Sequence, residues 1–405
     1  MNFSLLLNSL AGGGAERVAI NLAKTISIKR IFLLEKDISY ELPPEVEVIS
    51  LTSHTIHTNS MFKTLYIPLY STKLSRLLSN NDIVISMLER ANYVNIFSST
   101  LSKHKSIISV RMSQLSGRVK IHPYNLLNRF LYPRADYVVV VSKGIGRELE
   151  RFYGVKVEKI KVIYNPLDLT LIQEKLKENL GRYEEIFAFP VIITAGRLTK
   201  QKGQWHLLRI FKELRKYHKD LKLVILGDGE LKDYLYNLSL DLGLKTFMWD
   251  RSELRVDYDV FFLGFQKNPF KFISRAKLFV FPSLWEGFPN ALVEAMACGV
   301  PVIASDCRSG PREILAPNTS PDYQTIEPEF TEYGVLMPVF DGKFKIANEL
   351  ITETERKWID TIKLLLFEDV LRDRLSAGAK VRAGDFELTK IAEEWKKLIE
   401  EIRNV

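Results

Sequence analysis

Hydrophobic residues fall into short β-branched runs that alternate with longer stretches of helical period. This alternation is typical of a parallel sheet flanked by helices. In the first half, strands are predicted at residues 3–7, 30–34, 46–51, 83–86, 107–110 and 137–141, and in the second half at 191–195, 221–226, 260–263, 278–281 and 302–304. The runs are nearly continuous in apolar character, as in strands buried on both faces. The chain is therefore predicted to be α/β, with two doubly wound domains.

Helical periods and chain breaks predict where these domains end. Helices are expected at residues 15–25, 204–217 and 230–242, and the stretch 357–403 is helical with an apolar stripe at Leu388, Ile391, Trp395, Leu398 and Ile402. Asn165-Pro166 interrupts local structure, so a linker is expected within 165–190, where residues 173–185 resemble a solvated helix. We expect domains at 1–170 and 171–385 and a last helix at 386–405. Residues 246–258 look like an insertion without an assigned purpose.

Composition narrows the class of protein. The 405 residues are 46% hydrophobic, enough for one core in each half. The chain has two cysteines, Cys298 and Cys307, which argues against a secreted disulfide scaffold and favours a reducing cytoplasm. No uncharged apolar run approaches the roughly 18 residues that span a bilayer, and the first residues lack a basic signal region. We expect a cytoplasmic protein that is soluble or peripheral on the inner face of the membrane.

Basic residues gather in one segment of a chain whose net charge is +8. Residues 101–135 contain seven Lys and Arg, no acidic residue, and neighbouring apolar side chains such as Leu126 and Phe130. Basic residues beside apolar ones suit an anionic membrane surface. An ordinary solvated basic face is the alternative. The segment has no recognisable nucleic-acid motif, so no nucleic-acid partner is expected.

Glycines follow the first predicted strand of each half. Gly12, Gly13 and Gly14 precede a helix, and their backbone can approach an anion closely at the helix start. A structural tight turn is the alternative. After the strand 191–195, the loop 196–203 is bounded by glycines and carries Arg197 and Lys202, which could converge on one diphosphate. Solvated cations on a strand-end loop are the alternative there.

Two glutamates frame the segment 282–301. Glu286 precedes a helix that begins near Asn290, and Glu294 lies about one turn inside this helix. Carboxylates accept hydrogen bonds from sugar and ribose hydroxyls. The amides of Asn290, Ala291 and Leu292 are expected to be free at the helix start for phosphate oxygens. The usual interpretation of two such glutamates is that they form salt bridges or cap a helix. The glycines and prolines around them make the pattern more specific than a glutamate pair alone.

Together, these motifs resemble glycosyltransferase family 4 of the two-domain GT-B fold, whose signature is a Glu, seven residues and a second Glu. The resemblance covers almost the whole chain. It implies two Rossmann-like domains facing across a cleft, with the acceptor on the amino-terminal domain and the nucleotide-sugar donor on the carboxyl-terminal one. It implies catalytic roles for Glu286, Arg197 and Lys202, and a donor site formed by Gly13, Gly14, Arg197, Lys202, Phe265, Glu286, Phe288, Asn290, Ala291, Leu292 and Glu294, with Glu294 on the ribose.

The family likeness also implies the reaction. Members retain the anomeric configuration and need no metal, so we expect a hexosyltransferase without cofactors that forms an α-linkage, with UDP favoured over GDP as the donor nucleotide. Weaker sequence similarities point to those family members that extend lipid-linked or surface glycans. The acceptor-side candidates are Glu89, Arg90, Asn92 and Arg111. Arg111 stands where many relatives have a histidine, so that histidine's role must pass to another residue or be dispensable.

Other interpretations remain open at this point. A nucleotide-sugar 2-epimerase would share the architecture but fits the two motif frames poorly. A non-catalytic RNA- or membrane-binding protein with a degenerate site is the alternative from another class. His54 and His57 have a metal-like spacing but no evident third ligand, so no metal site is expected.

Overall fold

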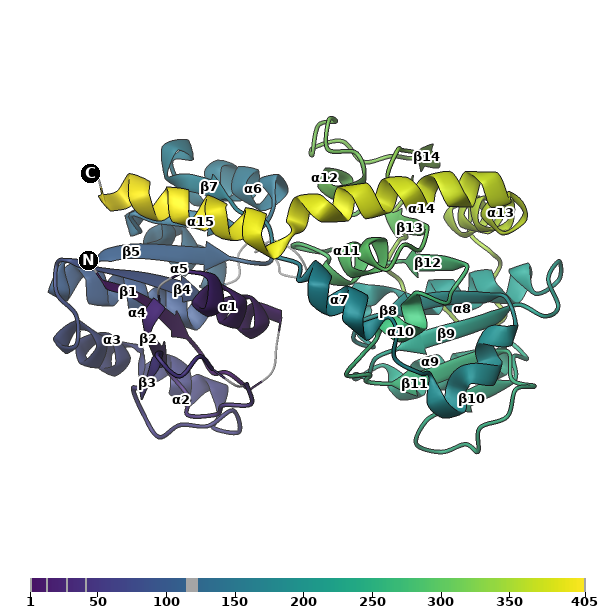
Figure 1. Cartoon of the computed structure of the whole chain (residues 1–405), viewed down its shortest axis with the longest axis horizontal. Helices are drawn as coiled ribbons and strands as arrows, with labels where there is room; N and C mark the ends of the chain where they lie inside the picture. The colour runs from purple at the N-terminus through teal and green to yellow at the C-terminus, as the bar shows by residue number, and fades with distance from the viewer. Residues whose placement is uncertain (1, 12–13, 27, 41, 114–122, 404–405) are drawn as a thin grey trace. The chain divides into compact units, whose positions relative to one another are not determined.

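The computed structural model describes residues 2–11, 14–26, 28–40, 42–113 and 123–403 (Figure 1). The chain divides into two compact units. Unit 1 comprises Met1–Pro166 and Leu388–Val405, and unit 2 comprises Leu167–Glu387. The sequence predicted the domain boundaries at 170/171 and 385/386. Leu167 pairs with Glu387 in a parallel bridge, so the two chain segments that enter and leave unit 2 lie side by side.

Unit 1 is built on a seven-stranded parallel sheet of order β3-β2-β1-β4-β5-β6-β7. Leu5 lies opposite Ile31 on one side and Ile85 on the other, and all three side chains are fully buried. The strands are β1 (Asn2–Leu7), β2 (Ile28–Leu33), β3 (Glu47–Ser50), β4 (Asp82–Met87), β5 (Lys105–Val110), β6 (Tyr137–Val140) and β7 (Ile160–Val162).

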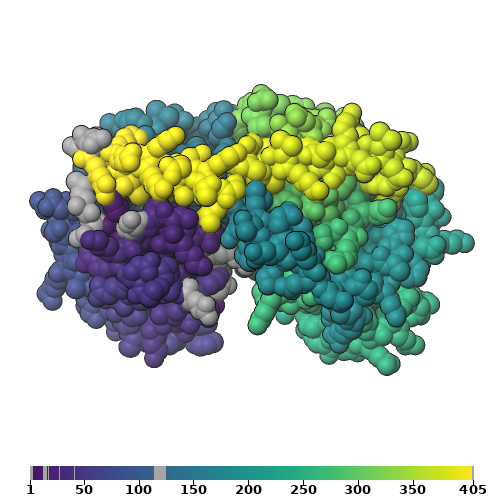
Figure 2. Space-filling view, viewed as in Figure 1, coloured from purple at the N-terminus to yellow at the C-terminus, as the bar shows by residue number. Residues whose placement is uncertain are grey.

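The helices of unit 1 include the last helix of the chain, α15 (Leu388–Arg403). The apolar stripe of α15 packs into the core of unit 1 through Ile391, Trp395, Leu398 and Ile402. Its opposite face lies on the molecular surface, in yellow in Figure 2. The others are α1 (Gly14–Thr25), α2 (Ser60–Leu65), α3 (Ile67–Arg76), α4 (Glu89–Ser102), α5 (Pro123–Leu131) and α6 (Lys143–Tyr153), with 3-10 turns Tyr132–Arg134 and Val157–Lys159.

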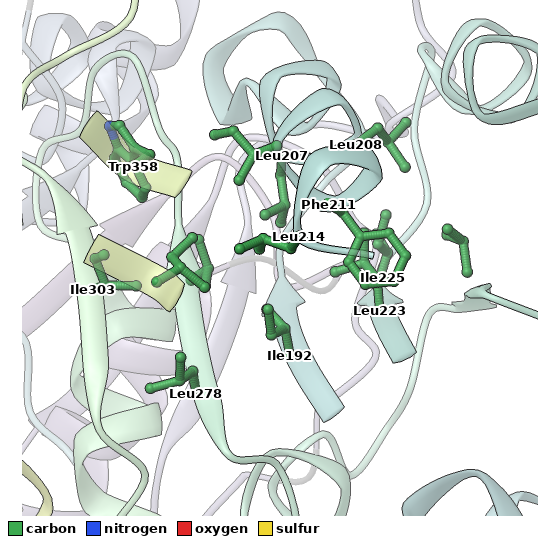
Figure 3. Close-up of a cluster of buried hydrophobic side chains, with 14 of the residues drawn as sticks. Ile192, Leu207, Leu208, Phe211, Leu214, Leu223, Ile225, Leu278, Ile303 and Trp358 are labelled. Atoms are coloured by element: carbon green, nitrogen blue, oxygen red, sulfur yellow. The ribbon is translucent and has the colours of Figure 1, made fainter. Parts of the chain in front are cut away.

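Unit 2 has an eight-stranded sheet of order β10-β11-β9-β8-β12-β13-β15-β14, in which only the β14–β15 pair is antiparallel. Figure 3 shows its core, where Leu207, Phe211 and Leu214 of one helix pack over the sheet. The strands are β8 (Val191–Ala195), β9 (Lys222–Leu226), β10 (Thr246–Met248), β11 (Val260–Gly264), β12 (Leu278–Phe281), β13 (Val302–Ser305), β14 (Glu329–Phe330) and β15 (Val335–Met337).

Helices α8 to α12 of unit 2 connect its strands, as in doubly wound sheets, whereas α7 precedes the first strand and α13 and α14 follow the last. The helices are α7 (Leu169–Lys175), α8 (Gln204–Leu214), α9 (Lys232–Asp241), α10 (Phe270–Ile273), α11 (Asn290–Ala297), α12 (Pro311–Leu315), α13 (Glu353–Phe367) and α14 (Asp369–Ala383), with 3-10 turns η3 (Gly181–Ala188), η4 (Lys200–Lys202) and η5 (Gly384–Phe386). The prediction of two doubly wound α/β domains is confirmed.

Several local predictions were wrong. Residues 173–185 do not form one helix, because α7 ends at Lys175 and a 3-10 turn begins at Gly181, which has a φ of +62°. By contrast, the boundary between the two units, after Pro166, lies within the region 165–190 where the linker was predicted. The apparent insertion 246–258 begins with β10, the edge strand beside β11. Strands β7, β10, β14 and β15 were missed because two- or three-residue strands are too short to show a period.

Candidate functional site

The carboxyl ends of three strands in unit 2 are joined by loops whose backbones touch. Gly203 closes the loop after β8 with a φ of +61°, and a Cβ there would lie 2.5 Å from the carbonyl oxygen of Pro282, just after β12. Gly227 follows β9 with a φ of +134°, and its Cβ would lie 2.0 Å from the carbonyl oxygen of Gly196. Only glycine fits such contacts without displacement. The sequence therefore brings the loops after β8, β9 and β12 into direct contact.

Lys202 and Glu286 form an ion pair at this junction. Lys202 Nζ lies 2.5 Å from Glu286 Oε1, and their side chains are 16% and 6% exposed. Gln201 Nε2 donates to Glu286 Oε2 at 3.1 Å, so both carboxylate oxygens have donors. A buried carboxylate is stable only when paired in this way. The structure thus joins two of the predicted catalytic side chains to each other.

Arg197 differs from Lys202 in its surroundings. Its side chain is exposed, and within the described ranges we find no hydrogen-bond or ion-pair partner for its guanidinium. The carbonyl oxygen of Arg197 accepts a hydrogen bond from Gln204 Nε2 at 3.0 Å, which fixes the loop to the first turn of α8. The loop backbone is therefore anchored while the cation faces solvent.

The helix α11 corrects one prediction about phosphate-binding amides. The Asn290 amide donates to the carbonyl oxygen of Phe288 at 3.1 Å, and the Leu292 amide donates to that of Pro289 at 3.0 Å. The expectation of three free amides was therefore wrong for these two, because the chain turns tightly before the helix. Within the described residues, the Ala291 amide has no backbone partner. Glu294 is half-buried on α11.

The remaining donor candidates lie in unlike environments. Phe265, directly after β11, is 75% exposed. Phe288 is buried against Phe386, with ring centroids 5.3 Å apart. Gly14 begins α1, whereas Gly13 lies outside the described residues. Phe265 is thus available to a ligand, and Phe288 has a packing role in this structure.

Unit 1 contains a cavity of about 460 Å³ beyond the carboxyl ends of β1, β4 and β5. The structure brings all four acceptor-side candidates to its wall. Its lining also includes small polar residues from other elements, so the cavity can offer hydrogen bonds on several sides. The lining residues are Asn8, Ser60, Thr64, Ile67, Leu88, Glu89, Arg90, Asn92, Tyr93, Ser109, Val110, Arg111, Met112, Ser113 and Tyr132.

Glu89 is oriented by a buried amide from α5. Asn128 Nδ2 donates to Glu89 Oε1 at 3.1 Å, and Asn128 Oδ1 accepts from the Tyr93 hydroxyl at 2.5 Å. Asn128 is fully buried. Leu88, the residue before Glu89, has a φ of +75° and a ψ of 152°, a region that side-chain-bearing residues rarely adopt. The position of Glu89 at the cavity is therefore held by both backbone and side chain.

Asn92 and Arg90 have partners within the protein. The Asn92 amide accepts from the Ser86 hydroxyl at 2.8 Å and donates to the carbonyl oxygen of Ser109 at 3.0 Å, so it links α4 to β4 and β5. Arg90 Nη1 lies 2.7 Å from Glu35 Oε1. Lys63 Nζ lies 3.1 Å from Glu35 Oε2, so two cations share one buried carboxylate. Asn92 has an evident structural role, and Arg90 is held at the cavity wall.

Arg111 is the cation with the weakest partner in the cavity. Its Nη2 donates to Asn165 Oδ1 at 2.5 Å, a neutral amide. Burial lowers the pKa of Arg111 to about 10, against the raising effect of the Glu16 carboxylate. Arg111 therefore remains charged at neutral pH.

Sequence reasoning missed three side chains that hold the lining residues or their partners in place. Glu35 follows β2, Lys63 lies on α2, and Asn128 lies on α5, so they are far from the candidates along the chain. None belongs to a recognisable motif. The one available signal was the pair of asparagines, Asn125 and Asn128, three positions apart on the leucine-rich helix α5, and both are buried.

No helix among the described residues has the length and apolar character needed to cross a membrane. The same residues contain no group of three or more His, Cys, Asp or Glu side chains that could hold a metal ion. His54, one of the two histidines with metal-like spacing, has its Nδ1 2.7 Å from the Tyr70 hydroxyl.

Family profiles match both halves of the chain. The profile described as Glycosyltransferase Family 4 matches residues 12–171, and that described as Glycosyl transferases group 1 matches residues 174–322.

Named relatives are similar over long stretches. An uncharacterised glycosyltransferase of Methanocaldococcus jannaschii is 37% identical over 68% of this chain and 66% of that protein. The Campylobacter jejuni N-acetylgalactosamine-N,N'-diacetylbacillosaminyl-diphospho-undecaprenol 4-alpha-N-acetylgalactosaminyltransferase is 30% identical over 98% of both chains.

Solved structures share the fold at low sequence identity. Anabaena HepE in complex with UDP has a TM-score of 0.74 and 19% identity, covering 99% of this chain and 100% of that one. The lipopolysaccharide outer core galactosyltransferase WaaB has a TM-score of 0.66 and 17% identity, covering 99% of both chains.

Proposed function

This chain belongs to the glycosyltransferases, with the Family 4 and group 1 domains of a GT-B enzyme, and we propose that it transfers a hexose from a nucleotide diphosphate sugar to a lipid-linked or surface glycan. The observation that carries the donor half of this proposal is the Lys202–Glu286 pair, held where the loops after β8 and β12 meet. A cation and a hydroxyl-accepting carboxylate at one point match the two parts of such a donor.

UDP is the donor nucleotide that we favour, with GDP as the alternative. Anabaena HepE, which shares the fold, was solved with UDP and with UDP-glucose. In our proposal, Glu294 accepts hydrogen bonds from the ribose, Glu286 accepts them from the sugar hydroxyls, and exposed Phe265 packs against the nucleotide. Arg197 and Lys202 bind the diphosphate.

The proposed reaction retains the anomeric configuration and forms an α-linkage. The bond between the sugar C1 and the diphosphate oxygen breaks, and an acceptor hydroxyl forms a new C1–O bond on the same face. The acceptor proton passes to the departing diphosphate. Arg197 and Lys202 stabilise the charge that develops on the leaving group. We propose that the reaction needs neither a metal ion nor another cofactor, and full activity in excess EDTA is the expected result.

The acceptor is proposed to bind the cavity of unit 1. The Campylobacter relative is named for a diphospho-undecaprenol acceptor, which motivates a lipid-linked glycan here. Glu89 would accept a hydrogen bond from the acceptor sugar, while Arg90 and Arg111 bind its polar groups. Asn92 would support the acceptor site indirectly. Its side-chain amide already bonds the Ser86 hydroxyl and the Ser109 carbonyl oxygen, and so holds the end of β5 in place.

We also propose a peripheral contact with the inner face of an anionic membrane through the segment 101–135. The described part of α5 buries two asparagines and exposes two large apolar side chains. Asn125 and Asn128 are buried, whereas Leu126 is 73% and Phe130 59% exposed. The Arg134 guanidinium lies 3.6 Å from the Phe130 ring centroid. Apolar side chains beside cations suit a lipid interface.

A radiolabel transfer assay tests the enzymatic proposal. Purified protein is incubated with UDP- or GDP-hexoses and with undecaprenyl-diphosphate-linked glycans, and the product is analysed for linkage by NMR. An α-linked product that depends on Lys202 would support the proposal. Conversion of the nucleotide sugar into its 2-epimer without an acceptor would favour the epimerase. Binding without any turnover would favour a degenerate binding protein.

Flotation with vesicles tests the membrane contact. The double variant Leu126→Glu/Phe130→Glu should lose binding to vesicles containing phosphatidylglycerol. A matched variant is Met61→Glu/Leu65→Glu on α2, where these residues are 65% and 68% exposed. If only the α2 variant loses binding, the lipid contact lies on α2 and the proposal for 101–135 is wrong.

A further inference from the structure

The cavity of unit 1 carries a partly buried positive charge, that of Arg111, that no carboxylate pairs with directly. Arginines elsewhere in the described chain are paired with carboxylates when buried. Arg209 bonds Glu355 at 2.9 Å, and Arg312 bonds Asp306 at 2.6 Å. In contrast, Arg111 bonds the neutral oxygen of Asn165. A partly buried guanidinium without a carboxylate is costly unless a ligand supplies the anion.

Unpaired hydrogen-bonding atoms lie in the same wall. The Ser109 hydroxyl and the Asn8 side-chain oxygen are buried and have no hydrogen-bond partner within the described residues. Ser109 is fully buried, and both residues line the cavity with Arg111. Buried polar atoms are nearly always bonded in folded proteins. Two exceptions in one cavity therefore indicate groups that a ligand completes.

The charge of the neighbouring wall does not cancel that of Arg111. Glu35 is shared between Arg90 and Lys63, which leaves an excess cation on that side. Glu89, the lining carboxylate, keeps its charge because its partner Asn128 is neutral. The cations Arg90, Lys63 and Arg111 still outnumber the carboxylates Glu35 and Glu89. Glu16 on α1 acts on Arg111 only through its field, and no ion pair joins the two among the described residues.

We infer that this cavity binds an oxyanion of the acceptor, either a phosphate or a carboxylate, through the fork of Arg111 and the hydroxyl of Ser109. Glu89 accepts a hydroxyl of the same molecule, so the acceptor class is a glycan that carries its negative charge close to the reacting sugar. This inference rests on the proposed glycosyltransferase function. Two sources have the required chemistry: a lipid-linked phosphate or diphosphate, and the carboxylate of a hexuronic acid.

Equilibrium binding of small probes to the full chain tests the inference. The probes are inorganic phosphate, pyrophosphate and glucuronate, with glucose as the neutral control, measured by calorimetry. Arg111→Gln should weaken binding of the effective oxyanion by about 10- to 100-fold, because a charge-assisted hydrogen bond is lost. Ser109→Ala should weaken it by a smaller factor. Arg76→Gln, an exposed arginine on α3, is the matched control and should bind as the unmodified protein does.

The probes also separate the two sources. Binding of phosphate or pyrophosphate alone points to a lipid-linked phosphate, and binding of glucuronate alone points to a uronic acid. Arg111→Lys, which keeps the charge but loses the planar fork, should have intermediate affinity and covers the case in which Arg111→Gln fails to fold. Equal affinities in the Arg111→Gln and Arg76→Gln proteins would overturn the inference.

Measurements of UDP binding and of nucleotide-sugar turnover distinguish a failure of the oxyanion site from a failure of the proposed glycosyltransferase function. UDP should bind Arg111→Gln as it binds the unmodified protein. If UDP affinity falls in parallel with probe affinity, the oxyanion belongs to the donor and the inference is wrong, while the glycosyltransferase function stands. If neither protein turns over any nucleotide sugar, the proposed function fails whatever the probes do.

Discussion

The glycine-framed loops of unit 2 and the cavity of unit 1 position charged side chains by different means. In unit 2, glycines bring three loop backbones into contact, and Lys202 and Glu286 pair at the junction. In unit 1, residues of α2, α3, α4 and β5 and of the loops after β1 and β5 line the cavity, and the buried amide of Asn128 holds its carboxylate. Backbone contacts require glycine at fixed positions, whereas side-chain networks can be built from many residue types. The first arrangement therefore leaves a sequence signature and the second does not.

The largest expected effect comes from breaking the unit 2 junction. Lys202→Ala should lower kcat by about 100- to 1000-fold, because it removes a cation from the leaving diphosphate and leaves Glu286 with fewer donors. Lys200→Ala is the control, since Lys200 is an exposed neighbour in the same 3-10 turn. Steady-state kinetics measure kcat of both variants. Equal kcat values for Lys202→Ala and Lys200→Ala would show that Lys202 has no part in the mechanism.

Acid should affect the two units in different pH ranges, and unit 1 should respond first. Burial lowers the pKa of His104 from 6.5 to about 4. The folded state then binds fewer protons than the unfolded state between these values, so stability falls as the pH drops through this window. The difference corresponds to roughly 3 kcal/mol at about 1.4 kcal/mol per pKa unit. The hydrogen-exchange protection factors of β4 and β5, which correct for the slower intrinsic exchange in acid, should fall as the pH drops from 6.5 to 4.

His104→Gln is the control for this pH effect. It removes the titrating ring that contacts Asn95 and Ser102, so the protection factors in unit 1 should no longer depend on pH in this window. A variant that keeps the full pH dependence would assign the acid response to another group.

Unit 2 should resist acid to a lower pH. Burial acts to raise the pKa of Glu355, but hydrogen bonds from His206 and Arg209 outweigh it and lower the pKa from 4.5 to about 2. The resulting stability is present above pH 4.5 and is lost as the pH falls towards 2. Roughly 3 kcal/mol is again expected. Glu355→Gln should lower the free energy of unfolding of unit 2 at pH 7, measured in urea, and should reduce its dependence on pH between 4.5 and 2. An unchanged pH dependence would mean that another group causes the acid response.

The smallest effect is expected from replacing glycines. Comparing two glycines of similar φ separates the cost of a steric contact from the cost of backbone strain. Gly203→Ala should lower stability by about 2 kcal/mol and weaken UDP binding, because its Cβ would displace the Pro282 carbonyl. Gly154→Ala is the matched control: its φ of +70° is similar, but its Cβ would meet nothing within 4 Å. It should lose only about 1 kcal/mol and bind UDP normally. Equal effects on UDP binding would mean that the loop contact does not support the donor site.

Local patterns were enough to predict much of this protein. Runs of buried residues such as 191–195 and 278–281 gave strands with the observed bounds, because a strand buried on both faces must be continuously apolar. The glycine-framed loops and the paired glutamates predicted the family to which the chain belongs. The stripe from Ile391 to Ile402 predicted a helix with one buried face, and α15 has this face in the core of unit 1.

Tertiary structure alone decided which side chains meet. The Lys202–Glu286 pair joins residues 84 positions apart, and Glu35 lies 55 positions from Arg90. The amides of Asn290 and Leu292 were predicted to be free but are bonded by a turn that the motif does not encode. Hydrophobic periodicity is a property of neighbours along the chain, so the sequence determined the elements and the backbone-built loops. Charge pairing depends on distances in space, so only the folded protein showed that the partner of Arg111 is a neutral amide and not a carboxylate.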